Sequence, residues 1–208
     1  MADETIEVKL KWFPIVSVLK SPNTFKTKLE AEYARAGKIV GLKIAALMRK
    51  KIRERKNYEK NAGMTIDMKG SSKPLVDSGR LFKAVTFTSV SSLKGPSVTV
   101  GVFRTSDAAN VARIVSAGAT IVVTPKMSRL FKALHAASMG RGGSIKSERG
   151  NELLAKSKGT IPALNVGTTL VIPPRNFALA TLKDPALAVI VEKEFSEALG
   201  RALAKMAK

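Results

Sequence analysis

The sequence lacks the residues from which many functional sites are built. It contains no cysteine and a single histidine, His135. Without cysteine, the chain can form neither a disulfide framework nor a thiolate metal site. No aspartate or glutamate lies near His135 in the sequence. We therefore interpret His135 as a surface or packing residue and predict no metal site.

Long apolar runs and aromatic residues are also scarce. No apolar run approaches the ~20 residues that span a bilayer, so we predict no membrane contact. The first residues, MADETIEVKLKW, alternate charged with apolar side chains and lack the apolar core of a secretory signal. Aromatic residues make up 5% of the chain, which disfavours base-stacking platforms for single strands. We expect folding in a cytosol-like compartment.

Recognisable catalytic motifs are missing as well. The sequence has no Gly-x-x-x-x-Gly-Lys-Ser/Thr phosphate loop, no Gly-x-Ser-x-Gly elbow and no His-Glu-x-x-His. The stretch from Gly140 to Ser147 is similar to a phosphate loop only in composition, and its spacing is wrong. We therefore predict no catalytic residues, no cofactor and no enzymatic activity.

Positive charge, by contrast, is abundant. The 208 residues include 36 Lys and Arg against 16 Asp and Glu, a formal net charge of +20. Such a field attracts polyanions or an acidic protein surface, but it does not specify a fold. With 45% hydrophobic residues, the chain has the composition of a folded protein.

Two basic stretches are the candidate contacts with DNA or an acidic partner. One runs through the end of the predicted N-terminal helix, and the other runs from residue 126 to 158. The candidates are Arg49, Lys50, Lys51, Arg53, Arg55, Lys126, Arg129, Arg141, Lys146 and Arg149. One interpretation is a solvated basic surface; the other is contact with phosphate backbone without base reading.

Hydrophobic periodicity predicts the elements of the first half. Residues 4–12 alternate with a period of two, which indicates a half-buried strand. From 23 to about 56 the period becomes helical. The predicted apolar stripe is Phe25, Leu29, Ala36, Val40, Ile44 and Leu47. Gly37 and Gly41 share one face of this helix, which indicates either a closely packed neighbour or a tolerated weak position.

The second half predicts short strands between helices. We expect a loop over 57–79, a hairpin of 81–91 with 97–103 around Lys94-Gly95-Pro96, and a helix over 107–117. A strand at 121–124, a helical turn at 129–137 and a mobile glycine-rich loop at 138–150 follow. The last predictions are a strand at 168–177 and a C-terminal helix capped by Asp184 with Pro185 first. Its predicted stripe is Leu187, Val191, Phe195, Leu199 and Leu203.

These elements predict one α+β domain over 1–208, an antiparallel sheet packed by a long N-terminal helix and a C-terminal helix. Residues 1–69 supply the first strand and the basic helix, and residues 70–208 supply the core with the flexible loop. At the start of that core, PLVDSGRL holds a cluster of turn formers. The predicted corner consists of Pro74, Asp77, Ser78, Gly79 and Leu81.

Four segments in order carry a resemblance. PLVDSGRLFKAV (74–85) resembles the Pro-Leu-x-Asp-Thr/Ser-Gly-x-Leu segment of the tail-completion, or virion-morphogenesis, proteins of long-tailed phages. VARIVSAG (111–118) is similar to that family's Tyr-Ala-x-Ile-His-x-Phe-Gly segment, with Val, Val and Ala at the Tyr, His and Phe positions. IVVTPKM (121–127) and IPPRNF (172–177) are similar to Val-Thr-Pro-Lys-Met and Ile-Pro-x-Arg-Pro-Phe. The matching positions are Gly118, Pro125, Lys126, Met127, Pro173, Arg175 and Phe177.

The resemblance, which covers about residues 70–205, implies a structural protein of the virion neck or upper tail. Many copies would form a ring, such as a hexamer or dodecamer, between the portal end of the head and the tail. Its partners would be neck, portal-side or tail proteins, with non-specific contact to channel DNA, after assembly in the host cytoplasm. The basic helix and the glycine-rich loop would project toward neighbours. Arg175 would pair with a carboxylate within the fold or at a subunit contact.

Two rival functions remain open. A basic nucleic-acid-binding accessory protein, of packaging or nucleoid type, explains the charge but not the four ordered segments. A tail-tube or tail-terminator subunit shares the structural class and differs in its place in the virion.

Overall fold

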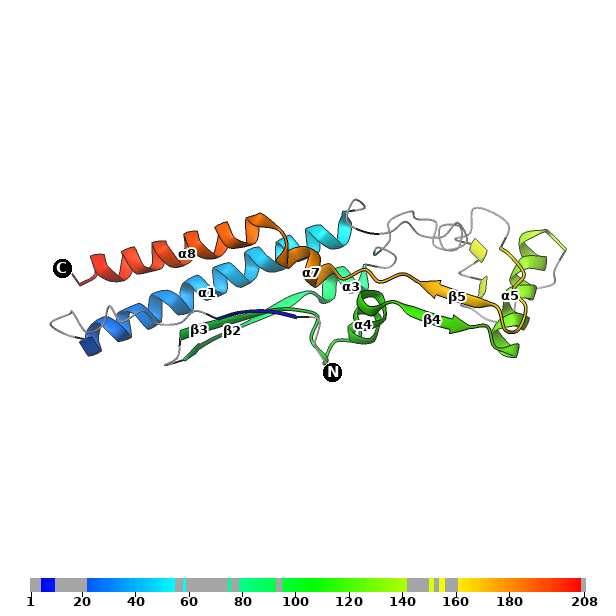
Figure 1. Ribbon diagram of the computed structural model, residues 1–208, viewed down its shortest axis with the longest axis horizontal. Coiled ribbons are helices and arrows are strands. Elements are labelled where there is room, and N and C mark those ends of the chain that lie inside the picture. Colours follow the sequence, from blue (N-terminus) through cyan, green and yellow to red (C-terminus); the bar gives the residue numbers. More distant parts are fainter. Residues whose placement is uncertain are drawn as a thin grey trace. The chain divides into compact units, whose positions relative to one another are not determined.

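The computed structural model describes residues 5–9, 22–54, 58, 75, 79–92, 95–141, 150–151, 154–155 and 161–206 (Figure 1). It is an α+β structure with antiparallel strands and a long helix toward each end, as predicted. Most of the predicted loop at 57–79 and most of the predicted mobile loop at 138–150 lie outside the described residues. The described part contains no helix both long and apolar enough to cross a membrane.

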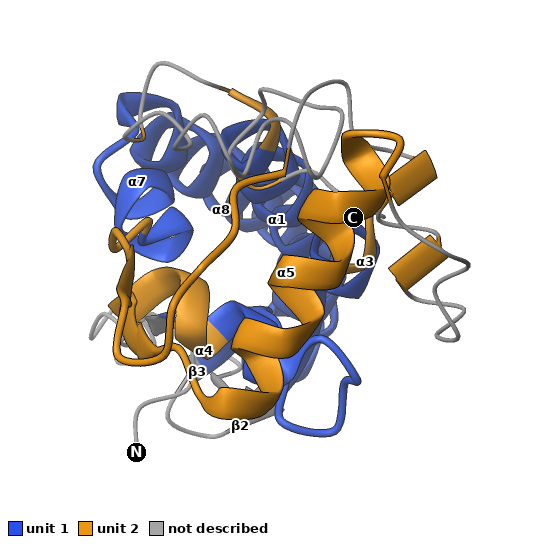
Figure 2. Cartoon of the chain, turned by 90° about the vertical axis from the view of Figure 1, so that its right-hand side faces the viewer, with its two compact units in different colours: residues 1–52, 81–112, 176–208 blue, residues 53–80, 113–175 orange. Residues whose placement is uncertain are grey.

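The chain divides into two compact units (Figure 2). Unit 1 comprises Met1–Ile52, Leu81–Ala112 and Asn176–Lys208. Unit 2 comprises Arg53–Arg80 and Arg113–Arg175. Each unit therefore combines segments that are far apart in the sequence.

Unit 1 is built on a three-stranded antiparallel sheet in the order β1-β3-β2. Its strands are β1 (Thr5–Lys9), β2 (Thr86–Ser92) and β3 (Gly95–Gly101). Ile6, Val100 and Phe87 stand opposite one another across the three strands, and Glu7, Thr99 and Thr88 form the next row. This alternation gives the sheet one apolar face and one polar face, as the period of two predicted for the first strand.

The long helix α1 (Pro22–Arg53) lies against the apolar face of the sheet. A Cβ atom built on Gly37 would lie 2.6 Å from Ser89 Oγ, and one on Gly41 would lie 2.2 Å from Phe87 Cδ2. The two glycines therefore let the helix backbone approach β2. Of the two interpretations of these glycines, close packing is the correct one.

Helix α8 (Pro185–Ala204) packs along the other side of α1, so that α1 lies between the sheet and α8 (Figure 1). Asp184 caps α8 by accepting from the Ala186 N–H at 2.9 Å, and Pro185 follows, as predicted. The buried face of α8 includes Phe195, Ala198 and Ala202. Leu203 is 43% exposed, so the predicted stripe was wrong at its last position.

The buried stripe of α1 agrees with the prediction except at its end. Phe25, Leu29, Ala36, Val40 and Ile44 are buried. Leu47, by contrast, is half-buried, and the adjacent Met48 is fully buried instead. Because α1 is covered by both the sheet and α8, it is a core element, and the prediction that it projects freely was wrong.

The predicted hairpin is present, with different bounds. A short helix, α3 (Arg80–Ala84), occupies the start of the expected first strand. Gly95 and Pro96, expected in the turn, begin β3. Pro96 pairs with Ser91 near the start of the strand, where a missing N–H costs least. A further short helix, α7 (Phe177–Leu182), lies beside β1 and was not predicted.

The described core of unit 2 combines a helix with a two-stranded ribbon. Helix α4 (Ala109–Ala117), within which the division between the units falls, ends at Gly118 as predicted. The antiparallel ribbon pairs β4 (Ala119–Val122) with β5 (Thr169–Ile172). Helix α5 (Pro125–Ser138) buries Phe131 and Leu134 against Ile161. It is a full helix, where only a helical turn was predicted.

Candidate functional site

The first family-like segment leads into α3. Of its predicted corner residues, Pro74, Asp77 and Ser78 lie outside the described residues. Gly79 has φ +76°, a left-handed conformation that favours glycine, and Leu81 is buried in α3. The described part of the corner is therefore structural.

The second and fourth family-like segments meet in unit 2. Gly118 has φ +75°, and a Cβ atom there would lie 2.8 Å from the Ile172 carbonyl oxygen and 3.0 Å from Pro174 N. The Arg175 N–H donates to the Val115 carbonyl oxygen at 2.8 Å. Segments more than fifty residues apart in the sequence are thereby held in close contact. Glycine is required at 118 both by its φ and by this contact.

The third segment is the start of α5. Thr124 caps the helix by accepting from the Met127 N–H, and Pro125 takes the first position. Farther along α5, the Ser128 hydroxyl donates to the Leu164 carbonyl oxygen at 2.7 Å. Val-Thr-Pro-Lys-Met is therefore a helix start, and its Lys126 is exposed.

The fourth segment continues into α7. Asn176, which replaces the family's second proline, caps this helix by accepting from the Leu179 N–H at 2.7 Å. Phe177 is fully buried and Arg175 is buried. The sequence signal that was missed is Asn176 itself, a preferred capping residue directly before an apolar run.

Two candidate basic residues are engaged within unit 1. The Arg49 guanidinium donates to the Val85 carbonyl oxygen at 2.7 Å. Lys51 forms an ion pair with Asp184 at 2.6 Å, and the Lys51 side chain is only 14% exposed. The Lys51 hydrogen bond, helped by the Ala186 N–H, lowers the pKa of the Asp184 carboxyl. Arg49 and Lys51 therefore both help to hold α1 in place, and their contact with DNA or an acidic partner stays a prediction.

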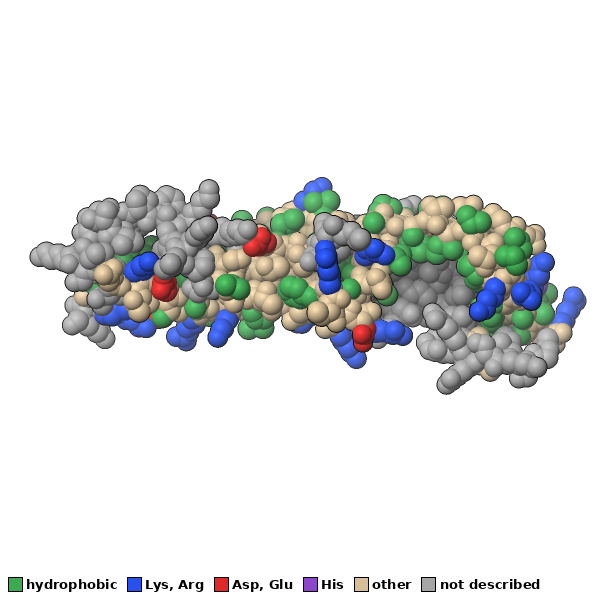
Figure 3. Space-filling view, turned by 90° about the horizontal axis from the view of Figure 1, so that it is seen from below, with side chains coloured by type: hydrophobic (Ala, Val, Ile, Leu, Met, Phe, Trp, Pro, Cys, Tyr) green, Lys and Arg blue, Asp and Glu red, His purple; other side chains and the backbone are tan. Residues whose placement is uncertain are grey.

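Of the other candidate basic residues, some are exposed and some lie outside the described residues. Lys50, Arg53, Lys126, Arg129 and Arg141 are exposed. Arg55, Lys146 and Arg149 lie outside the described residues. On the face seen in Figure 3, blue Lys and Arg side chains are spread along the molecule and far outnumber the red acidic ones. The basic residues that the structure describes are therefore not gathered into one cluster on that face.

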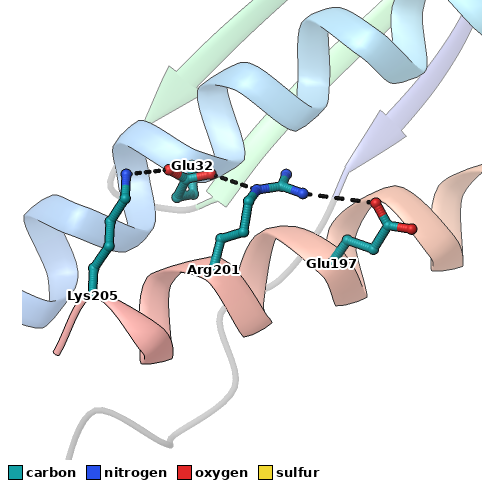
Figure 4. Close-up of polar contacts among 4 residues, drawn as sticks. All are labelled: Glu32, Glu197, Arg201 and Lys205. Atoms are coloured by element: carbon teal, nitrogen blue, oxygen red, sulfur yellow. Dashed lines mark hydrogen bonds and ion pairs between the residues drawn. The ribbon is translucent and has the colours of Figure 1, made fainter. Parts of the chain in front are cut away.

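Buried carboxylates between α1 and α8 escaped the sequence analysis. Glu32 accepts from Lys205 Nζ at 2.5 Å and from Arg201 Nε at 2.8 Å (Figure 4). These hydrogen bonds lower the pKa of the Glu32 carboxyl to about 2, although burial opposes them. Glu194, also buried, pairs with Lys43. The acidic and basic members of these pairs are more than a hundred residues apart in the sequence, so no local sequence pattern predicts them.

The described residues contain no group of three or more His, Cys, Asp or Glu side chains that could hold a metal ion. The Nδ1 atom of His135 lies 2.6 Å from the Ile161 carbonyl oxygen, so the ring is held against the backbone. An open groove of about 540 Å³ runs beside the start of β2. It is lined by Thr86, Phe87, Thr88, Phe103, Arg104, Thr105 and Ser106, which include no carboxylate and no imidazole.

Comparison with known proteins adds no family. No protein-family model matches the sequence, and neither the curated proteins nor the solved structures include a match.

Proposed function

We propose that the chain is a structural virion protein of the neck or upper tail of a long-tailed phage, where copies form a ring that joins or completes the head–tail interface. One observation carries the proposal. The second and fourth family-like segments meet at Gly118, Ile172 and Pro174, where the motif positions make close backbone contacts. Family-like segments that hold the fold together are compatible with a structural protein that acts through contacts with its neighbours.

The construction of unit 1 is compatible with a load-bearing subunit. Helix α1 is covered on one side by the sheet and on the other by α8. Ion pairs of Glu32, Glu194 and Asp184 join the ends and the middle of the two helices. Such a body can present fixed surfaces to identical neighbours, as a closed ring requires.

The positive charge has a place in this function. In the ring, exposed cations such as Lys126, Arg129 and Arg141 would face either the passing DNA or acidic neck and tail proteins. Both contacts would weaken with salt. We expect Arg49 and Lys51 to contribute less to either contact, because each already has a partner inside unit 1.

The proposal is tested by locating the protein in the virion. Purified particles of the phage that carries the gene would be treated with gold-labelled antibody against this chain and imaged by electron microscopy. Label concentrated between head and tail supports the proposal. Particles that carry no copy of the chain contradict it.

The net charge of +20 favours a second candidate, a basic nucleic-acid-binding accessory protein. That function predicts DNA binding by the isolated chain and normal virion assembly without it. It leaves unexplained why the family-like segments form the structural junctions of unit 2.

A further inference from the structure

Helix α5 carries a row of cations opposite its buried face. The exposed cations, spaced by three residues, are Lys126, Arg129 and Lys132. The buried side chains of the same helix are Ser128, Phe131 and Leu134. Each buried position follows a cation by two residues, which is about 200° around the helix. The cationic row therefore points away from the core of unit 2.

Negative charge is absent from the sequence around this row. Residues 113–141 contain five Lys or Arg and residues 161–175 contain one, and neither range contains Asp or Glu. The exposed cations of 113–141 that have no hydrogen-bond or ion-pair partner for their side chains among the described residues are Lys126, Arg129, Lys132 and Arg141. In unit 1, by contrast, Lys43 and Arg201 pair with buried carboxylates. Over α5, Figure 3 shows blue Lys and Arg side chains and no red one.

Within the fold, the row is electrostatically unfavourable. Residues three apart are neighbours on a helix surface, so Lys126 repels Arg129, and Arg129 repels Lys132. A polyanion that lies along the row would remove this repulsion without breaking any ion pair or hydrogen bond that the described residues make with these side chains. The row is thus better suited to a bound polyanion than to the isolated chain.

The helix that carries the row is firmly positioned. The Ser128 hydroxyl donates to the Leu164 carbonyl oxygen at 2.7 Å, and the Nδ1 atom of His135 lies 2.6 Å from the Ile161 carbonyl oxygen. Phe131 and Leu134 pack on the Ile161 side chain. These contacts fix which face of α5 is exposed, so the cations are presented in one orientation.

The composition of the surface favours DNA over an acidic protein. Protein interfaces are rich in aromatic side chains and poor in Lys, but the single aromatic residue of 113–141 and 161–175 is Phe131, which is buried. Contact with phosphates requires only cations. The row rises about 9 Å along α5, a length over which duplex DNA carries roughly five phosphate charges. The helix contains no Asn or Gln that would read adenine.

We propose that the row of Lys126, Arg129 and Lys132, with Arg141 just beyond the helix, is the surface that contacts the phosphate backbone of double-stranded DNA without reading its bases. The inference rests on the proposed function for the identity of that DNA, which is the molecule passing through the ring. It places the contact on α5 and not on the basic end of α1, where Arg49 and Lys51 have partners inside unit 1.

A charge-matched pair of triple variants tests the proposal. Lys126→Gln/Arg129→Gln/Lys132→Gln removes the row, and Arg35→Gln/Lys38→Gln/Lys193→Gln removes three exposed cations of α1 and α8. Both lower the net charge by the same amount, and both should keep the wild-type melting temperature. Binding of a short labelled duplex is followed by fluorescence anisotropy across a salt series. We expect at least about tenfold weaker binding and a salt slope lower by up to ~2.7 for the α5 variant, against less than about twofold for the control. Equal weakening in the two variants, or no binding by the wild type at low salt, overturns the proposal.

Acetylation of the wild-type chain provides a test without substitutions. Reactive lysines are acetylated with and without duplex DNA and are located by mass spectrometry. We expect DNA to protect Lys126 and Lys132 and to leave Lys38 and Lys193 reactive. Equal protection of all four lysines overturns the proposal. Protection of Lys126 and Lys132 by poly-glutamate and not by DNA also overturns it, and identifies an acidic protein as the partner.

Failure of this inference is distinguishable from failure of the proposed function. Both binding tests use the isolated chain, whereas the proposed function is tested by gold labelling of virions. Label between head and tail together with no protection of α5 by DNA would overturn only the DNA contact. Protection of α5 by DNA in a chain that virions do not contain would leave the contact in place and overturn the neck function.

Discussion

Gly41 and Gly37 set the distance between α1 and the sheet. A Cβ atom at Gly41 would overlap the Phe87 ring, whereas at Gly37 the nearest atom is the Ser89 hydroxyl oxygen, which can rotate away. Their four-residue spacing was visible in the sequence. The neighbour was not, because Phe87 lies on a strand more than forty residues away and nothing local links the two positions.

Replacing Gly41 with alanine is expected to destabilise the protein by about 1–3 kcal/mol, because the ring of Phe87 must move in a packed core. Gly200→Ala is the control, since a Cβ atom there meets nothing within 4 Å on the exposed side of α8. It should stabilise by up to ~1 kcal/mol through helix propensity. Urea unfolding measures both. A Gly41→Ala protein as stable as the wild type contradicts the close packing.

Gly118 combines backbone conformation with a close contact. Its φ is +75°, nearly that of Gly79 at +76°. At Gly79 a Cβ atom meets nothing within 4 Å, whereas at Gly118 it meets Ile172 and Pro174 backbone atoms. Comparing alanine substitutions at the two glycines therefore separates the free-energy cost of the positive φ from that of the steric overlap with Ile172 and Pro174.

Alanine at Gly79 is expected to cost about 1 kcal/mol, and alanine at Gly118 about 2–4 kcal/mol, because only the second also displaces backbone. Thermal unfolding followed by circular dichroism compares the two variants. Equal losses would mean that conformation alone explains Gly118, and the proposed junction between α4 and the segment after β5 would lose its physical basis.

At the scale of elements, α1 and α8 are joined by ion pairs whose acidic member is buried. Glu32 meets Arg201 and Lys205, and Arg201 also lies 3.7 Å from Glu197 (Figure 4). Because α1 and α8 run antiparallel, these pairs fix which turn of one helix faces which turn of the other. A hydrophobic stripe alone would allow the helices to slide.

Glu32→Gln is expected to cost about 1–2 kcal/mol at neutral pH, since it removes charge-assisted hydrogen bonds while its half-exposed partners regain water. Glu197→Gln, at an exposed carboxylate, should cost less than about 0.5 kcal/mol. Urea unfolding at neutral pH compares these variants with the wild type.

The Glu32 carboxylate makes the free energy of unfolding depend on pH. The pKa of Glu32 is about 2 when folded, against an ordinary value of 4.5, so the folded state binds this proton less tightly than the unfolded state. Its contribution is fully present above pH 4.5 and is lost as the pH falls toward 2. The difference in free energy of unfolding between the wild type and Glu32→Gln should therefore decrease as the pH falls from 4.5 toward 2. A gap that does not change with pH would contradict the role of Glu32.

The sequence predicted the elements with strong local signals and missed those with weak ones. Helices α1 and α8 have long apolar stripes and clear starts, and the β2–β3 hairpin has β-branched alternation. Helices α3 and α7 are only five and six residues long, too short for a helical period to be distinguished from a strand. Helix α5 was predicted too short because the capping role of Thr124 before Pro125 was overlooked.

At the scale of the whole molecule, charge was predictable in amount and not in placement. Composition gave +20, but it could not separate Arg49 and Lys51, engaged inside unit 1, from exposed residues such as Lys126 and Arg129. The partners of Arg49 and Lys51, the Val85 carbonyl and Asp184, lie far away in sequence. The sequence therefore predicts which residues carry positive charge, but not which of them have partners within the fold.

Exposed and internal cations should behave differently in DNA binding. We expect weak, sequence-independent binding whose salt slope falls by up to ~2 in Lys126→Ala/Arg129→Ala, about 0.9 for each phosphate that is no longer neutralised. Arg49→Ala should leave the slope unchanged and lower the melting temperature, because its guanidinium bonds Val85. Fluorescence anisotropy across a salt series measures the slopes. A slope that falls only in Arg49→Ala would reverse this assignment.

The central claim, a structural role between head and tail, is tested most directly by removing the protein. An early stop codon would be placed in this gene in the phage that carries it, and the lysate would be imaged by electron microscopy. We predict DNA-filled heads beside unattached or malformed tails. Complete virions, or empty heads with unpackaged DNA, would contradict the account and favour the nucleic-acid-binding alternative.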